Sequence, residues 1–515
     1  MREADREALV FDDQRFDYAS MAECVASLAT GLRDLGLRRG DRVAIYLPPS
    51  AALPLSIFAA SKADGVFVPI YHGLFPEQVA HILRDSGARA LVTDARRWQA
   101  LEDARLQTRE LEFAIVTGGV ETESTCPAHD FEQLCRQAPA AGQADKCVEK
   151  DLAAIIYTSG STGGPKGVML SHANLLAGAE IVSDYLGITK HDRLLAALPF
   201  SFDAGLNQLT TSVLQGATIV MIGFQFGRDI VQMLAKERIT GLAGVPSLWG
   251  LLAQPSSGLG SQALPDLRYI TNTGGAMPQN VLARLRAVLP QTQVFLMYGL
   301  TEAFRSTYLP PEELDRRPNS IGKAIPNTEI LVINEAGQRC APGEPGELVH
   351  HGPTVSMGYW GCPELTHRVL RPHPMPPAGG NEVPRVCYSG DLVRSDEEGF
   401  LFFVGRRDDQ IKSAGFRISP TEVEEVICRV PAVRQAAVVG APDPLLGQHL
   451  VAFAVLEEQA DIDPADILMN CAAALPRHMV PKRVELVSEL PMTSSGKINY
   501  PQIRDRLSAE SAAAL

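Results

Sequence analysis

Thr158-Ser-Gly-Ser-Thr-Gly-Gly-Pro-Lys-Gly167 is the stretch of this sequence that decides the fold. It holds four glycines, four hydroxyl side chains and one lysine, between the apolar run Leu152–Tyr157 and a helix-like stretch that begins near His172. Glycines let backbone N–H groups converge on an anion, and hydroxyls and a lysine add donors and charge. The order differs from a Walker A loop, because proline precedes Lys166 and glycine follows it. We expect a loop that binds polyphosphate; the alternative is a flexible surface turn.

Size and charge restrict the class of protein. A chain of 515 residues is too long for one hydrophobic core, so we expect two or more domains. Acidic residues outnumber basic ones 60 to 47, and the net charge of −13 disfavours nucleic acid or an anionic membrane as the main partner. No apolar run approaches the roughly 20 residues of a membrane helix, and the N-terminus lacks an apolar signal core. The sequence therefore predicts a cytoplasmic protein with no nucleic-acid and no membrane partner.

Alternation of strand-like and helix-like segments predicts an α/β fold for the first three hundred residues. A helix is expected from the spacing of apolar residues between Met21 and Leu32, whereas residues 118–148 have no clear period and read as a surface connection. The expected strands are Ala8–Phe11, Arg15–Tyr18, Arg42–Leu47, Phe67–Ile70, Ala90–Thr93, Phe113–Thr117, Arg193–Leu198, Thr218–Ile222, Gly241–Val245, Tyr269–Asn272 and Gln293–Met297.

The pattern changes beyond Ile321 to short alternating segments between turn residues, which predicts a β-rich subdomain. A further α+β unit follows near residue 407. We therefore expect a large N-terminal domain, residues 1–406, with two βα-layered subdomains and a β-rich one, and a small mobile α+β domain, residues 407–515. The later expected elements are strands at Glu329–Ile333, Gly346–His350, Gly399–Val404, Arg434–Val439 and Leu450–Leu456, a loop at 371–384, and helices at Thr421–Val430 and Pro464–Ala474.

Four further motifs follow the glycine-rich stretch in a fixed order: Tyr298-Gly-Leu-Thr-Glu302, Tyr388-Ser-Gly-Asp391, the segment 405–418 and Pro491-Met-Thr-Ser-Ser-Gly-Lys-Ile498. Their joint order and spacing resembles the adenylate-forming superfamily of acyl-CoA synthetases, luciferases and amino-acid adenylation domains, over essentially the whole chain. Residues 302–311 resemble the acyl-CoA ligases found beside exosortase gene clusters. Free-standing prolyl- and D-alanyl-type carrier-protein ligases are also similar.

The resemblance implies a two-step reaction that uses ATP and Mg²⁺. A carboxylate displaces pyrophosphate from ATP, and a phosphopantetheine thiol, on a carrier protein or on coenzyme A, then releases AMP. Such chemistry needs charge neutralisation at the phosphates. Glu302 and Thr162 are the implied metal ligands, and Lys497, Glu302 and Thr301 the implied catalytic residues. The implied nucleotide-binding residues are Thr158, Ser159, Gly160, Ser161, Thr162, Lys166, Gly274, Tyr298, Gly299, Asp391 and Arg406.

Lys497 is implied to bridge the carboxylate and the α-phosphate, the alternative being a solvated lysine in a Gly-Lys turn. Asp408 matches the hinge position, about which the small domain turns between the two half-reactions. Lys412 and Gly415 match the face that approaches the thioester-forming tunnel. For Asp408 and Lys412 the alternative is ordinary surface charge.

The substrate pocket departs from fatty-acyl and aryl ligases, which usually carry Phe-His where this chain has Phe202-Asp203. In amino-acid adenylation domains, which it resembles here, the aspartate pairs with the substrate ammonium. The alternative is that Asp203 caps a helix starting at Ala204. Arg305 could meet a substrate anion, but a salt bridge with a nearby loop is the expected reading. Pocket positions implied by the same alignment are mostly small or polar and indicate a compact substrate: Asn207, Ala243, Thr271, Thr273, Met297, Arg305 and Ser306.

Three functions remain open from the sequence. The preferred one is a ligase that adenylates a small amino acid, with proline a candidate, and transfers it to a carrier protein. A second is an acyl-CoA synthetase for a short or medium-chain acid, in which Asp203 is only a helix cap. A third is a non-catalytic nucleotide-binding protein of the same fold.

Overall fold

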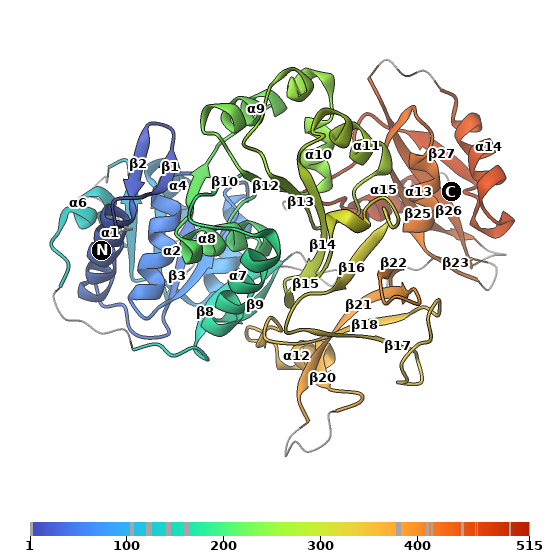
Figure 1. The fold of residues 1–515 in the computed structure, drawn as a ribbon. Helices are drawn as coiled ribbons and strands as arrows, with labels where there is room; N and C mark the ends of the chain where they lie inside the picture. The colour runs from blue at the N-terminus through green and yellow to red at the C-terminus, as the bar shows by residue number, and fades with distance from the viewer. Residues whose placement is uncertain are drawn as a thin grey trace.

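The computed structural model contains three β-sheets with helices packed on them (Figure 1). Two large sheets and their helices form most of the chain, and the third sheet belongs to the C-terminal region, drawn in orange and red. No helix among the described residues is both long enough and apolar enough to cross a bilayer. The structure describes residues 4–103, 108–119, 126–140, 146–158, 165–376, 383–407, 411–413, 416–443, 447–458, 460, 462–493 and 496–513.

The first sheet is 14-stranded, and its strand pairing changes from parallel to antiparallel across the sheet. From β1 through β11, β10, β12 and β13 to β14 the strands are parallel, and from β15 onward they are antiparallel. The expected β-rich subdomain therefore continues the α/β sheet rather than standing apart from it. The strands are β1 Glu7–Phe11, β2 Gln14–Asp17, β10 Arg193–Ala196, β11 Thr218–Met221, β12 Gly241–Gly244, β13 Tyr269–Asn272, β14 Gln293–Leu300, β15 Ala303–Leu309, β16 Ser320–Ala324, β17 Glu329–Ile333, β18 Gly346–His351, β20 Leu370–Pro372, β21 Arg385–Ser395 and β22 Leu401–Arg406.

The second sheet is 8-stranded, with the order β19-β9-β8-β4-β3-β5-β6-β7. Two expectations change here. Lys166 begins strand β9, which pairs antiparallel with β8, so the glycine-rich stretch joins two strands before the helix at His172. The expected surface connection 118–148 also contains β7 and a short helix, α6. The strands are β3 Arg42–Tyr46, β4 Val66–Pro69, β5 Ala88–Asp94, β6 Phe113–Thr117, β7 Ala128–Asp130, β8 Leu152–Thr158, β9 Lys166–Ser171 and β19 Gly358–Tyr359.

Helices separate and cover the two large sheets, as the buried side chains show. Leu28 of α1 and Ile57 of α2 share one core with Val182 of α7 and Leu206 of α8. Helices α9, α10 and α11 pack on the other side of the first sheet, and α3 and α4 on the other side of the second. The helices are α1 Tyr18–Asp34, α2 Ala52–Lys62, α3 Pro76–Ser86, α4 Ala95–Ala100, α6 Phe131–Arg136, α7 His172–Leu186, α8 Asp203–Gln215, α9 Gly227–Lys236, α10 Pro246–Leu252, α11 Gln279–Val288 and α12 Pro363–Val369.

The third sheet forms a small α+β unit with its own cores. Arg284 of α11 in the large domain pairs with Glu457 beside this sheet, with 2.9 Å between Nη1 and Oε1. The domain boundary at 406/407 stays a prediction. The elements are β23 Ile411–Ser413, β24 Phe416–Ile418, β25 Val433–Asp443, β26 Gly447–Leu456, β27 Arg483–Leu486, α13 Pro420–Cys428, α14 Pro464–Ala474 and α15 Tyr500–Ala513.

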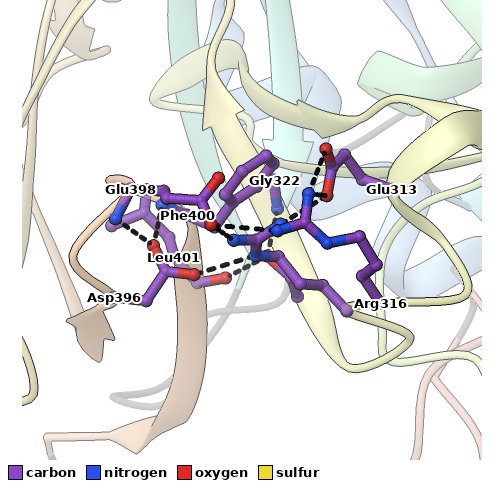
Figure 2. A network of polar contacts seen from close by, with 9 residues as sticks. Glu313, Arg316, Gly322, Asp396, Glu398, Phe400 and Leu401 are labelled. Carbon is purple, nitrogen blue, oxygen red and sulfur yellow. Dashed lines mark hydrogen bonds and ion pairs between the residues drawn. The ribbon is translucent and has the colours of Figure 1, made fainter.

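A polar network fixes the chain before β16 to the connection between β21 and β22 (Figure 2). The guanidinium of Arg317, whose side chain is 9% exposed, pairs with Glu313, Asp396 and Glu398, and it lies 4.0 Å above the Phe400 ring. Burial raises the pKa of Asp396, but hydrogen bonds led by the one from Arg317 outweigh it, so that pKa is lowered. The network therefore stabilises two strands, β21 and β22, that also carry predicted site residues.

We expect Arg317→Ala to lower the melting temperature by about 2–4 °C, because it leaves three carboxylates without their shared cation. Arg316→Ala is the control: that side chain is 59% exposed and contacts two of the same carboxylates, so the shift should be within about 1 °C. Because the folded-state pKa of Asp396 is lowered, the contribution is present at pH 7 and is lost as pH falls below the ordinary value of 3.8. Thermal unfolding of both variants from pH 7 to pH 3 checks this, and equal shifts for the two would contradict it.

Candidate active site

A cavity of about 2070 Å³ lies between the large domain and the C-terminal unit. Its walls come from the carboxyl ends of strands β8, β13 and β14, from β21 and β22, and from the turn that precedes α15. Carboxyl ends of parallel strands meet at one edge of a sheet, which is where α/β proteins bind ligands. The sequence-predicted site residues that line the cavity are Thr158, Lys166, Asp203, Thr273, Gly274, Met297, Tyr298, Gly299, Thr301, Glu302, Asp391, Arg406 and Lys497.

The remaining predicted residues fall into two groups. Asn207 and Arg305 are buried behind the cavity wall, and Ala243, Thr271 and Ser306 do not line it either. Lys412 lies in β23. The predicted residues outside the described part of the chain are Ser159, Gly160, Ser161, Thr162, Asp408 and Gly415, together with the side chain of Lys412.

Glu302 follows the end of β14 and is held by a tyrosine that the sequence analysis missed. The Tyr359 hydroxyl donates to Oε1 of Glu302, and the Ser356 N–H donates to the Glu302 carbonyl, 2.9 Å away. Burial, reinforced by the Glu302 charge, raises the pKa of Tyr359, so this hydroxyl stays protonated and remains a donor. One carboxylate oxygen is thus fixed, which leaves Oε2 as a hard ligand of the kind that suits Mg²⁺. No local pattern marks Tyr359, because it reaches Glu302 from a distant strand.

Asp391 is held from two sides. The Tyr298 hydroxyl donates to its Oδ2, and the Arg406 Nε lies 2.9 Å from its Oδ1. The Tyr298 ring stacks on His350, which the sequence analysis assigned to a strand but not to the site, with 6.2 Å between centroids and 13° between planes. Burial lowers the pKa of His350 to about 3, so its ring is neutral at pH 7. Burial also raises the pKa of Tyr298 well above its usual value, which keeps its hydroxyl a donor.

Lys497 reaches the large domain through two turns that lack side chains. A Cβ added at Gly274, where φ is +78°, would lie 3.3 Å from Lys497 Cε. A Cβ added at Gly496, where φ is +76°, would lie 3.0 Å from Ser247 Oγ. Among the described residues no carboxylate forms an ion pair with the Lys497 ammonium. The lysine therefore projects into the cavity as a cation available for an anionic ligand.

Asp203 is the first residue of α8, and Phe202 is the N-cap. Its Oδ1 accepts a hydrogen bond of 2.8 Å from the Ala204 N–H, so the carboxylate serves the first turn of the helix while it also lines the cavity. The helix begins one residue earlier than the expected start at Ala204. Asp203 is therefore not the helix cap of the alternative reading, but its carboxylate still has a structural contact in the first turn. The geometry is compatible with that structural role and with pairing to a substrate ammonium.

Arg305 does not form the salt bridge expected for it. The side chain is 4% exposed, and its guanidinium donates to Thr273 Oγ1 over 3.2 Å and to the Ala204 carbonyl over 3.4 Å. Within the described part of the chain, no carboxylate is in ion-pair range of this guanidinium. The expected surface pairing fails because the β15 backbone directs the side chain inward.

The cavity brings together the groups that a triphosphate and its metal require. Lys166, Arg406 and Lys497 supply positive charge, while Glu302 and Thr301 supply oxygen ligands. The fixed Glu302 carboxylate and the Asp391–Tyr298 pair give a rigid set of acceptors near those cations. These residues fit ATP and Mg²⁺.

Family comparisons agree with this geometry. The model "AMP-binding enzyme" matches residues 1–360, and "AMP-binding enzyme C-terminal domain" matches residues 422–497. The chain belongs to the AMP-binding enzyme family. Its relatives are AMP-forming acid–thiol ligases, so this member of the AMP-binding family is an ATP-dependent enzyme of that class, and the reading as a non-catalytic nucleotide-binding protein was wrong.

Similar proteins span different acids and acceptors. A feruloyl-CoA synthase of Amycolatopsis is 32% identical over 95% of this chain and 93% of its own. A linear gramicidin synthase of Brevibacillus parabrevis is 31% identical over 96% of this chain, which is 6% of that protein. An anthranilate CoA ligase with bound anthranoyl-AMP superposes with a TM-score of 0.90 at 25% identity, covering 100% and 96% of the two chains. The o-succinylbenzoate CoA synthetase of Bacillus subtilis with ATP and magnesium reaches 0.82 at 27% identity and 97% of each chain.

We expect Lys497→Ala to slow adenylate formation by about 100- to 1000-fold while nucleotide binding changes little, since its charge acts chiefly in the transition state. Pyrophosphate exchange measures the first effect and calorimetric titration with ATP the second. Lys482→Ala is the matched control, because Lys482 pairs with Asp443 in the same domain, away from the cavity. Comparable exchange rates for Lys497→Ala and the parent protein would contradict the assigned role.

Tyr359→Phe should raise the Mg²⁺ concentration for half-maximal pyrophosphate exchange about 10-fold, because the Glu302 carboxylate loses the donor that orients it. Tyr18→Phe removes a hydroxyl that bonds Ser212 and Ala217 far from the cavity, so it should leave the Mg²⁺ dependence in place. A lower maximal rate with an unaltered Mg²⁺ midpoint would show that Tyr359 does not act through a metal site.

Proposed function

We propose that this enzyme adenylates a small amino acid and transfers the aminoacyl group to the phosphopantetheine thiol of a carrier protein. The observation that carries the substrate class is Asp203, a carboxylate in a cavity wall that also contains Leu198, Phe202 and Met297. A carboxylate beside apolar side chains costs free energy unless a cation joins it. The ammonium group of an amino acid supplies that cation, whereas a fatty or simple aromatic acid does not.

In the first half-reaction, a carboxylate oxygen of the amino acid attacks the α-phosphorus of ATP. The bond between that phosphorus and the bridging oxygen breaks, and pyrophosphate leaves with the electron pair. Lys497 neutralises charge as it shifts between the carboxylate and the phosphate, and Lys166 and Thr301 bind phosphate oxygens. Glu302 would hold Mg²⁺, which would neutralise charge on the phosphates, and Asp391 would accept hydrogen bonds from the ribose.

In the second half-reaction, the thiol of the carrier attacks the acyl carbon and AMP leaves. A single cavity serves both steps if the C-terminal domain turns about Asp408, so that Lys412 and Gly415 replace Lys497 beside the large domain. This reorientation follows from the resemblance. Lys497 lines the cavity, which supports the proposal that this arrangement of the two domains serves adenylation.

A second candidate function is acyl-CoA formation from a short or medium-chain acid. The hydrogen bond from the Ala204 N–H to Asp203 favours it, because that bond gives the carboxylate a structural role without any substrate. The name of the feruloyl-CoA synthase relative also favours coenzyme A as the acceptor. The two functions differ in whether an amino group is required.

Asp203→Asn should lower kcat/KM for amino acids about 30- to 1000-fold, because a charge-assisted hydrogen bond becomes a neutral one. Matched acids without the amino group should lose far less. Pyrophosphate exchange with pairs such as alanine and propionate measures the difference.

Asp229→Asn is the control for a purely structural carboxylate, because Asp229 accepts hydrogen bonds from Gln225 and Phe226 at the start of α9, outside the cavity. It should lower the melting temperature and leave the substrate preference alone. If Asp203→Asn behaves in the same way, Asp203 is a helix residue only. A parent enzyme that activates propionate as well as alanine would establish the acyl-CoA synthetase instead.

A further inference from the structure

Arg305 is a buried cation held by weak contacts. Its two hydrogen bonds, to Thr273 Oγ1 and to the Ala204 carbonyl, are long at 3.2 and 3.4 Å, and its buried Nε has no hydrogen-bond partner among the described residues. Neutral acceptors at these distances compensate poorly for the hydration that a guanidinium loses on burial. Burial of the Arg305 charge therefore costs free energy that the described contacts do not offset.

The backbone at Arg305 is also strained. The residue has φ of +70°, in the left-handed region that non-glycine residues rarely adopt, although it lies within strand β15. Gly299 on the neighbouring strand makes this possible, since a Cβ there would lie 3.0 Å from the Arg305 N and Cα. The pairing of β14 with β15 shifts register between Tyr298 and Leu300, next to this point. Strain of this kind persists where the surrounding structure enforces it, and it is concentrated at functional sites.

A second unsatisfied donor lies on α8. Asn207 is 2% exposed, and its buried Nδ2 has no hydrogen-bond partner within the part of the chain that the structure describes. Asn207 follows Asp203 by four residues, so the two side chains share one face of the helix. Asp203 lines the cavity, and Asn207 lies one turn deeper on the same helix.

The Arg305 guanidinium lies directly behind the cavity wall. Thr273 and Ala204, the two residues that hold the Arg305 guanidinium, both line the cavity. The guanidinium is therefore one hydrogen bond away from the space in which the acid binds. Arg305 and Asp203 both contact Ala204, through its carbonyl and its N–H respectively, yet they do not pair with each other.

We propose that Arg305 and Asn207 bind a second carboxylate of the substrate, so that the preferred substrate is a small amino acid with an acidic side chain. The proposal rests on the acid-adenylating activity proposed above and adds the class of side chain. An incoming carboxylate supplies acceptors to both donors and a counter-charge to the guanidinium. Asp203 pairs with the ammonium of the same molecule, so each charge of the substrate has its complement. Proline, which lacks the second carboxylate, becomes a poor substrate under this assignment.

The test compares aspartate with asparagine, which differ by a carboxylate against an amide of the same shape. Pyrophosphate exchange by the parent enzyme should favour aspartate in kcat/KM by about 10- to 100-fold. Arg305→Met removes the charge but keeps a side chain of similar length. It should bring the ratio of kcat/KM for aspartate to kcat/KM for asparagine close to one. Arg305→Lys keeps the charge and should retain part of the preference. Glutamate and proline complete the panel.

A purely structural role for Arg305 predicts a different result. Arg305→Met would then lower the melting temperature and reduce exchange with aspartate and asparagine by the same factor. Under the proposal the melting temperature of Arg305→Met is equal to or above that of the parent, because a poorly compensated buried charge is removed. A parent enzyme that uses asparagine or proline at least as well as aspartate overturns the proposal, as does an unchanged ratio in Arg305→Met.

Failure of the proposed function is distinguishable from failure of this inference. If no amino acid supports exchange, the amino-acid assignment is wrong, and succinate against succinamate then tests the same carboxylate–amide difference without an amino group. A succinate preference that Arg305→Met abolishes supports the second-carboxylate site on its own. Exchange with alanine or proline but without any preference for acidic substrates keeps the amino-acid ligase and overturns the role of Arg305.

Discussion

The active arrangement depends on the close approach of two glycine turns, one from each domain, to side chains of the other domain: Gly274 faces Lys497, and Gly496 faces Ser247. Gly274 closes the β13 end of the large domain, and Gly496 precedes the lysine in the C-terminal unit. Both adopt positive φ, so a larger residue would be strained, and its Cβ would lie in tight contact with a side chain of the other domain. The two glycines thus let Lys497 lie close to the wall of the large domain.

Around that contact, a tyrosine hydroxyl orients each carboxylate, with Arg406 as a second partner of Asp391, and the Lys497 ammonium is left for the ligand. Tyr359 orients Glu302 and Tyr298 orients Asp391, and in both tyrosines burial holds the phenol in its protonated form. The neutral ring of His350 backs Tyr298 without adding charge. A site organised in this way is preorganised for an anionic ligand, since its dipoles need little rearrangement when that ligand arrives.

The order of elements and the motif residues of the cavity could be predicted from the sequence, because strand patterns and motifs are local. Strands β13 and β17 match their expected bounds, and family membership followed from motif order. Partners supplied by distant strands could not be predicted, which is why Tyr359 and His350 were missed. The Arg305 side chain points inward because the Arg305 backbone is itself left-handed, opposite Gly299. This is a tertiary effect that overrides the local pattern. The chemical roles assigned to the site residues stay predictions, and Asp408 and residues 159–162 lie outside the described part of the chain.

The ion pair between Arg284 and Glu457 makes one contact between the large domain and the C-terminal unit sensitive to salt. One partner is about half exposed, and such pairs contribute roughly 0–1 kcal/mol, at most about twice the thermal energy. This contact therefore breaks and re-forms readily and adds little to the free energy that holds the two units together. Added salt screens the pair and weakens it further. The ionic strength of the medium thus acts on this exposed contact, and much less on the buried polar groups of the cavity wall.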